Sequence, residues 1–196
     1  MNSNQIRNIL QQGIHKKFKT GVYACDQLHN VKSDQFAIIV NSDDSNHKGM
    51  HWLAIFKKRN CEIEFFDSFA MPISFYSPRI KFFLEQFSKR VILNTQQVQS
   101  NYSNTCGHFS IYYLLHRVRG WSLPCIVQDF SKTNLIKNDE KVYSFVKSNF
   151  YNHEHVNFKS TKDNVDVEEM DESFCSLQSS KSFRHICKCK YSTKYQ

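Results

Sequence analysis

The 196-residue sequence contains no long hydrophobic run. Its aliphatic and aromatic runs are short, such as FAIIV at 36–40, whereas a membrane-spanning helix needs roughly 20 apolar residues. The first residues, MNSNQIRNILQQG, lack the continuous apolar segment of a secretion signal. We therefore expect a protein that neither spans nor binds a membrane and that works inside a cell.

The sequence also lacks the regular cysteine spacing of a disulfide-rich protein. Its seven cysteines are an odd number, and they occupy positions 25, 61, 106, 125, 175, 187 and 189. Because disulfides persist mainly in oxidising compartments, this irregular pattern favours a reducing, intracellular setting in which most thiols are free.

Hydrophobic residues make up 40% of the chain and aromatic residues 14%, which is enough to build a folded core. No internal repeats are evident. We expect one domain over residues 1–150. Beyond it, an acidic stretch at 163–172 is followed by a basic one and apolar periodicity is poor, so residues 151–196 are interpreted as a flexible or loosely attached tail.

The formal net charge of +8 belongs entirely to the predicted domain. Seven of the 26 Lys and Arg and seven of the 18 Asp and Glu lie in residues 151–196, which leaves 19 basic and 11 acidic residues in 1–150. A basic body can attract a polyanion such as DNA by releasing condensed counterions. Taken alone, however, this charge is equally typical of an ordinary basic protein surface.

Hydrophobic periodicity predicts an α+β fold. Residues 16–28 are expected to form a loop, and the strands at 50–56 and 61–69 to pair as a hairpin. Two more strands are predicted at 35–41 and 91–99. Helices are predicted at 2–13, 79–90, from Cys106 to a C-terminal cap at Gly120, at 122–130 and at 140–150.

The stretch NTCGHFSIYYLLHRVRG predicts a nucleophile at Cys106. The cysteine lies where a polar loop becomes an apolar helix, and the positive end of a helix dipole lowers the pKa of a thiol. Gly107 would let the backbone approach a substrate carbonyl closely. A lone cysteine is more often a small core residue, so the interpretation depends on the residues that precede it.

Those residues supply the other parts of a catalytic site. His51 begins a predicted central strand, and Trp52 beside it could form one wall of the cleft. Asp67 lies near the end of the paired strand, where it could orient the imidazole. Gln99 lies seven residues before Cys106 and could donate to an oxyanion together with the Cys106 backbone N–H.

The ordered set HW, FFDSF and QSNYSNTCGHF resembles the adenovirus protease (adenain) family of cysteine proteases. The likeness extends to GVYACD at 21–26 and to 36–56. The run over 116–146 looks especially like adenain-type proteases of Maverick/Polinton elements and related DNA viruses. The resemblance covers roughly residues 1–150 and leaves the tail unmatched.

The resemblance implies the adenain α+β fold, with a small mixed sheet between helices, and thiol proteolysis by a monomer. Cys106 would attack the scissile carbonyl, His51 would transfer the proton, Asp67 would orient His51, and Gln99 would complete the oxyanion hole. The expected substrates are viral or element precursor proteins cut during capsid maturation, in the host nucleus or the virion. No cofactor is needed for this chemistry, although DNA could activate the enzyme.

One feature of adenain is missing. The adenain cysteine that bonds the activating viral peptide lies eleven residues before the glutamine, and Ser88 occupies that position here. Activation by a disulfide-linked peptide is therefore unsupported.

Two other functions remain open at the level of sequence. Ulp-type ubiquitin-like-protein (SUMO) proteases share the same residue order but usually place Asp directly before the cysteine, where this chain has Thr105. A basic nucleic-acid-binding protein without catalysis would explain the charge but not the four site residues.

Two histidine and cysteine groups invite other interpretations. Cys175, His185, Cys187 and Cys189 could ligate a metal, but a C-x-C pair departs from the usual spacing of structural zinc sites, so no metal is expected. His108 lies two residues after Cys106, and on a helix it would point to another face, so His51 is the better base.

Overall fold

A computed structural model describes residues 1–151. Its central sheet follows the order β1-β2-β3-β4-β5, with the two end pairs parallel and the two inner pairs antiparallel. The β3–β4 pair is the predicted hairpin, with Ala54 opposite Phe66. The strands are β1 (Lys19–Ala24), β2 (Phe36–Asn41), β3 (Trp52–Lys57), β4 (Ile63–Phe66) and β5 (Val91–Leu93).

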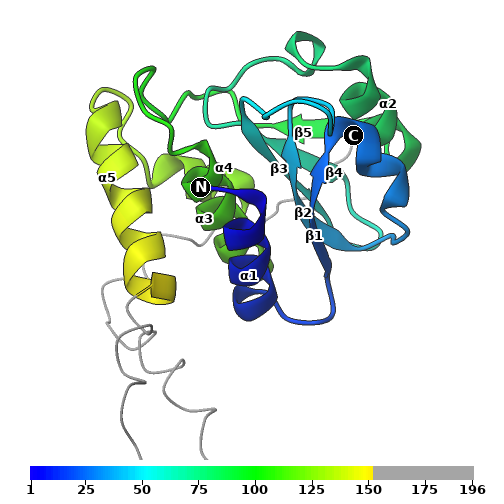
Figure 1. The fold of residues 1–196 in the computed structure, drawn as a ribbon, viewed down its shortest axis with the longest axis horizontal. Coiled ribbons are helices and arrows are strands. Elements are labelled where there is room, and N and C mark those ends of the chain that lie inside the picture. Colours follow the sequence, from blue (N-terminus) through cyan, green and yellow to red (C-terminus); the bar gives the residue numbers. More distant parts are fainter. Residues whose placement is uncertain (152–196) are drawn as a thin grey trace, which may run out of the picture. The chain divides into compact units, whose positions relative to one another are not determined.

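Helices cover both faces of this sheet (Figure 1). Strands β2 and β3 are buried on both sides, so their apolar residues alternate between two cores. Ala37, Ile39 and Ala54 pack with α1, α3, α4 and α5. Phe36 and Ile38 pack on the other side with α2 and a 3-10 helix, η1.

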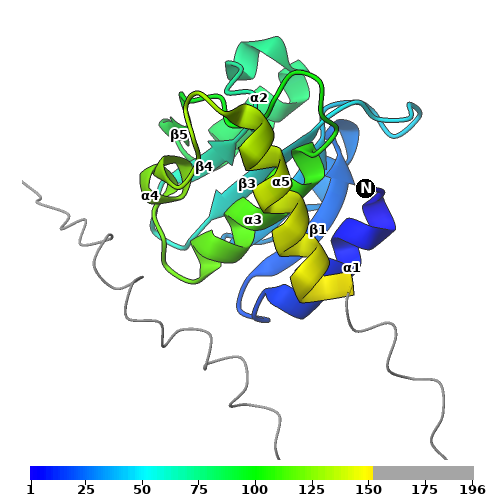
Figure 2. The same ribbon diagram turned by 90° about the vertical axis from the view of Figure 1, so that its left-hand side faces the viewer.

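The helices follow the amphipathic segments of the sequence. Helix α3 is the most deeply buried, and α5 lies along it (Figure 2). Helix α3 ends just before Gly120, which has a left-handed φ of 99°, as expected of a residue just past a helix end. The helices are α1 (Ser3–Gly13), α2 (Pro78–Phe87), α3 (Cys106–Val118), α4 (Leu123–Gln128), α5 (Leu135–Val146), the 3-10 helices η1 (Cys25–Asn30) and η2 (Ile73–Phe75), and a π turn, η3 (Lys147–Tyr151).

Three sequence-based boundaries are clearly wrong. The strand predicted at 91–99 ends at Leu93, and residues 94–99 belong to the loop that leads to α3. The segment 16–28, predicted as a loop, contains β1 and η1. Strand β1 is half-exposed along most of its length and is held by parallel pairing with β2, so it carries no apolar alternation that a sequence pattern could detect. Helix α5 begins at Leu135, earlier than predicted, because the Asn134 side chain caps it by accepting from the Lys137 N–H.

The α+β fold with a small mixed sheet between helices is confirmed. None of the helices in the described part of the chain has the length and apolar character needed to cross a bilayer. Apart from Tyr151, which ends η3, the predicted tail lies outside the described residues, and so do the thiols and histidine considered as metal ligands.

Candidate active site

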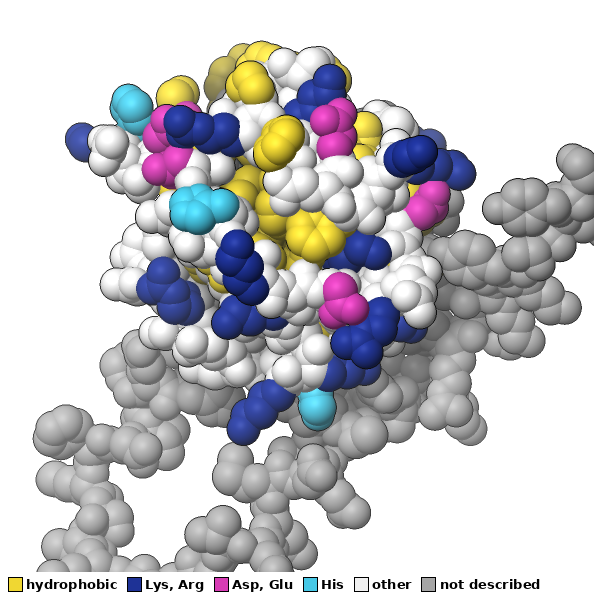
Figure 3. Space-filling view, turned by 90° about the vertical axis from the view of Figure 1, so that its right-hand side faces the viewer, with side chains coloured by type: hydrophobic (Ala, Val, Ile, Leu, Met, Phe, Trp, Pro, Cys, Tyr) yellow, Lys and Arg dark blue, Asp and Glu magenta, His cyan; other side chains and the backbone are white. Residues whose placement is uncertain are grey.

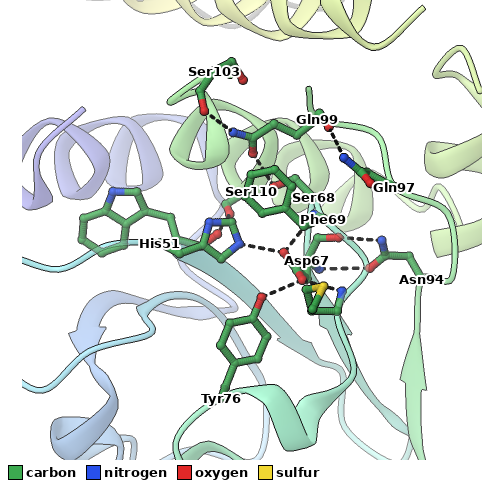
Figure 4. Close-up of polar contacts among 12 residues, drawn as sticks. His51, Asp67, Ser68, Phe69, Tyr76, Asn94, Gln97, Gln99, Ser103 and Ser110 are labelled. Atoms are coloured by element: carbon green, nitrogen blue, oxygen red, sulfur yellow. Dashed lines mark hydrogen bonds and ion pairs between the residues drawn. The ribbon is translucent and has the colours of Figure 1, made fainter. Parts of the chain in front are cut away.

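The three residues predicted to form a catalytic triad are brought to one place by three elements. His51 directly precedes β3, Asp67 directly follows β4, and Cys106 is the first residue of α3. Because β3 and β4 pair as a hairpin, the start of one strand lies beside the end of the other. His51 Nε2 and Asp67 Oδ1 are 2.7 Å apart (Figure 4).

His51 also lies close enough to Cys106 for each group to shift the pKa of the other. Since Nε2 faces Asp67, Nδ1 is the ring nitrogen left for the sulfur. Burial alone would lower the pKa of His51, but the interactions with Asp67 and Cys106 outweigh it and raise the pKa to about 9. Protonated imidazolium is therefore favoured at neutral pH.

Cys106 shows the complementary shift. Burial would raise the pKa of its thiol, but the proximity and charge of His51, with the backbone N–H groups of Trp52 and Gly107, lower the pKa. A thiolate paired with an imidazolium is the reactive form of a cysteine nucleophile. The geometry thus favours an activated Cys106.

Asp67 is a fully satisfied carboxylate. Besides His51, Oδ1 accepts from the Phe69 backbone N–H at 3.0 Å, while Oδ2 accepts from the Met71 N–H at 2.8 Å and from the Tyr76 hydroxyl at 2.7 Å. Burial would raise its pKa, but the hydrogen bonds from His51 and Tyr76 outweigh burial and lower the pKa. Asp67 therefore stays ionised and fixed as the orienting group.

Two residues that support Asp67 were not recognised in the sequence. Tyr76 follows η2 and stacks on the His51 ring with centroids 6.2 Å apart. Asn94, just after β5, holds the Asp67 backbone from both sides: its Oδ1 accepts from the Asp67 N–H at 2.9 Å and its Nδ2 donates to the Asp67 carbonyl at 2.6 Å. Neither segment carries a motif, so only the three-dimensional contact identifies them.

Gln99 lies in the loop between β5 and α3 and is buried (Figure 4). Its Oε1 accepts from the Ser68 hydroxyl at 2.6 Å, and its Nε2 donates to the Ser103 carbonyl at 2.9 Å. The Nε2 group carries a second N–H, which is the donor an oxyanion hole would use. The oxyanion-hole role of Gln99 and of the Cys106 N–H stays a prediction.

Trp52 and Gly107, the two residues predicted to line the cleft, lie close together. A Cβ added to Gly107 would lie 3.2 Å from the Trp52 ring and 3.6 Å from Met1, so close packing of α3 on Trp52 is what this glycine permits. Trp52 lines a cavity of about 390 Å³ beside the first residues of α1. Their roles in substrate binding stay predictions.

A larger cavity of about 910 Å³ opens beside His51. Its wall is mostly apolar, and Met50 and Phe75 in it are largely exposed, at 87% and 65%. A mostly apolar hollow with a few polar groups is the usual form of a ligand site. It is lined by Cys25, Ser42, Asp43, Asp44, His47, Met50, His51, Phe69, Met71, Phe75, Tyr76, Ser77, Gln97 and Asn101.

His108 is placed away from this chemistry, as the helical spacing predicts. It is buried, its ring lies 5.4 Å from that of Tyr143, and its Nδ1 has no hydrogen-bond partner among residues 1–151. Burial, together with the N-terminal ammonium, lowers its pKa to about 4. A neutral, buried imidazole is a poor candidate for the general base.

Within residues 1–151, no group of three or more His, Cys, Asp or Glu side chains is arranged to hold a metal ion. The site described above consists instead of one thiol, one imidazole and one carboxylate in series. Such a series performs nucleophilic chemistry on carbonyl groups, with the base activating the thiol and the carboxylate orienting the base.

No family model and no curated protein matches the sequence. Among solved structures, the ASFV pS273R protease is similar with 20% identity and a TM-score of 0.47, over 74% of this chain and 65% of that one. The central domain of the uncharacterized Lpg1148 protein from Legionella pneumophila is similar with 13% identity and a TM-score of 0.45, over 75% and 98%. This chain thus spans about two thirds of the ASFV protease, and these values assign it to no family.

Proposed function

We propose that this protein is a cysteine endopeptidase. One observation carries the proposal: His51 is hydrogen-bonded to Asp67 and also interacts with Cys106, the first residue of a buried helix. The opposite pKa shifts of Cys106 and His51 favour the thiolate–imidazolium pair. A structural cysteine buried in the core has no need of such a pair.

The arrangement supports the following steps. The Cys106 thiolate attacks the scissile carbonyl, and the resulting oxyanion accepts hydrogen bonds from the Cys106 N–H and Gln99 Nε2. His51 gives its proton to the leaving amine, the C–N bond breaks, and a thioester remains. His51 then takes a proton from water, the hydroxide attacks the thioester, and the acid product leaves as Cys106 is regenerated. Asp67 holds the imidazole in one orientation throughout.

The substrates we propose are precursor polypeptides of a virus or a mobile element, cleaved during capsid maturation. The proposal for substrates draws on the sequence resemblance to adenain, together with the cavity beside His51, which is large enough to take substrate side chains. DNA as an activating polyanion belongs to the same proposal and is compatible with the basic charge of residues 1–150.

The test is to incubate the purified chain with a library of peptides made from a digested proteome, and to identify new termini by mass spectrometry. We expect cleavage by the wild-type protein and by Cys61→Ala, since Cys61 is exposed and lies outside the site. Cys106→Ala should cleave nothing. Equal cleavage by Cys106→Ala, or none by the wild type, would contradict the proposal; DNA binding without cleavage would favour the non-catalytic alternative.

A further inference from the structure

The loop that joins Gln99 to Cys106 is held from one side by helix α5, through two adjacent buried side chains. Asn138 is only 2% exposed. Its Nδ2 donates to the Val98 carbonyl at 2.9 Å and to the Ser131 carbonyl at 2.8 Å, while its Oδ1 accepts from the Ser131 N–H at 2.8 Å. It therefore fixes the chain immediately before Gln99.

Asp139 holds the other end of the same loop. Its Oδ1 accepts from the Ser103 hydroxyl at 2.9 Å and from the Thr105 hydroxyl at 2.8 Å, and its side chain is buried. Ser103 is also the residue whose carbonyl accepts from Gln99 Nε2. One carboxylate oxygen thus holds both the partner of Gln99 and the residue that directly precedes Cys106.

These contacts also decide what Thr105 does. Thr105 is the N-cap residue of α3, yet its side chain makes no capping hydrogen bond. A threonine at this position usually accepts from an N–H of the first turn. Here its hydroxyl donates to Asp139 instead, and the first-turn N–H of Gly107 interacts with the Cys106 sulfur. By binding the Thr105 hydroxyl, Asp139 leaves the backbone N–H groups in the first turn of α3 available to the reacting atoms.

We infer that Asn138 and Asp139 are positioning residues of the peptidase: they set the distance and orientation of Gln99 relative to the Cys106 N–H, the two donors proposed to bind the oxyanion. This inference rests on the proposed function and adds to it a clamp on α5, outside the triad and the oxyanion hole. Two donors on one loop stay at a fixed separation only if both ends of the loop are fixed.

The clamp makes a specific kinetic prediction. Neither Asn138 nor Asp139 lines the cavity beside His51, and of the loop between Gln99 and Cys106 only Asn101 does, so loosening the clamp should impair the chemical step more than substrate binding. Small misplacements of catalytic groups can cost up to about a hundredfold in rate. The isosteric Asp139→Asn keeps an oxygen that can accept both hydroxyls, so it should retain most of the function.

The experiment measures kcat and KM of Asp139→Ala, Asp139→Asn and Glu140→Ala on the peptide that the wild type cleaves fastest. Active sites are titrated with a peptide vinyl sulfone, so that only folded, reactive enzyme is counted. We expect Asp139→Ala to lose about tenfold to a hundredfold in kcat with KM within about threefold. Asp139→Asn should stay within about threefold of wild type in both, and Glu140→Ala, the exposed neighbour on α5, should match wild type.

The possible results distinguish a failure of the positioning role of Asp139 from a failure of the proposed peptidase function. A wild-type-like kcat for titrated Asp139→Ala would contradict the clamp while leaving the peptidase intact, even if the melting temperature fell. A loss confined to KM would also contradict it. No peptidase activity in the wild type would instead contradict the proposed function, and the inference with it.

Discussion

His51 is the residue on which the proposed mechanism depends, because it interacts with both Cys106 and Asp67. Its raised pKa and the lowered pKa of Cys106 have a common origin, since each group stabilises the charged form of the other. Titration of such a pair belongs to both groups together. The pH dependence of catalysis is therefore a direct readout of the pair.

We expect a bell-shaped pH profile of kcat/KM. Activity should rise as Cys106 loses its proton, below the pKa of about 8.5 of a free cysteine, because the thiol pKa is lowered. It should fall again as His51 loses its proton near its pKa of about 9, because the neutral imidazole can no longer protonate the leaving amine. Stopped assays from pH 5 to 10 measure both limbs, and an acid limb at or above pH 8.5 would contradict the pairing.

Gln99 offers a second test at the residue scale. In Gln99→Ala, we expect kcat to fall by about 10²–10³, the usual cost of one oxyanion donor. The rate of Cys106 alkylation by iodoacetamide should change little, because alkylation forms no oxyanion. Both rates are compared with Gln11→Ala as a control, since Gln11 is exposed on α1 and lines neither cavity. An unchanged kcat in Gln99→Ala would argue against its role.

The sequence predicted His51, Asp67 and Cys106 as one group because each residue type suits one catalytic task, and the structure brings these three together. Tyr76, Asn94 and Asp139 were not predicted. Tyrosine, asparagine and aspartate are common in loops and helix ends, and their importance here lies in which atom they contact. Their partners lie between nine and 36 positions away in the chain.

At the scale of elements, hydrogen bonds and an ion pair connect α3 to β4, the strand that directly precedes Asp67. Glu64 on β4 accepts from Arg117 through both carboxylate oxygens, each at 2.7 Å, and from the Tyr113 hydroxyl at 2.6 Å. The Arg117 guanidinium also lies 4.7 Å from the centre of the Phe56 ring. This buried pair fixes the helix that carries Cys106 relative to the strand that leads to Asp67.

Breaking this pair should destabilise the fold strongly. Removing one partner of a buried ion pair leaves an uncompensated charge and typically costs 3–5 kcal/mol, so we expect a loss of about 4 kcal/mol in the free energy of unfolding for Arg117→Met. Urea denaturation followed by circular dichroism measures it. Arg59→Met is the matched control, because its ion pair with Asp34 is exposed and should matter little. Equal effects of the two variants would contradict the account.

Elements with strong apolar patterns were predictable, and those held by pairing alone were not. Strands β2 and β3 and helix α3 carry apolar residues at the spacing of their structures. Strand β1 contains Gly21 and is half-exposed at most positions, so only its partner β2, twelve or more residues later, makes it a strand. Such a non-local contribution is invisible to local periodicity.

At the scale of the whole molecule, the net charge is the feature that bears on partners. On the face that carries α2, Lys and Arg side chains are interspersed with Asp and Glu around a hollow where apolar side chains gather (Figure 3). This face offers dispersed basic groups rather than one basic stripe. Attraction of DNA to this face would then be weak and governed by counterion release.

We therefore expect weak, sequence-independent DNA binding that depends steeply on salt. A labelled duplex should bind in fluorescence anisotropy at about 50 mM salt and be released by about 200 mM, since each phosphate contact adds to the salt dependence. Heparin should displace it, because only charge is recognised. Binding that survives 200 mM salt, or discriminates between duplex sequences, would contradict this picture.

The central claim is an activated Cys106–His51 pair, and the most direct measurement is iodoacetamide labelling of the intact protein at pH 6, with each modified cysteine mapped by mass spectrometry. We predict that Cys106 is modified selectively, and much faster than the exposed Cys61, because among the cysteines of residues 1–151 only Cys106 is paired with an imidazolium. The selectivity should disappear in His51→Ala. Indifferent labelling of the cysteines, unchanged by His51→Ala, would contradict the claim.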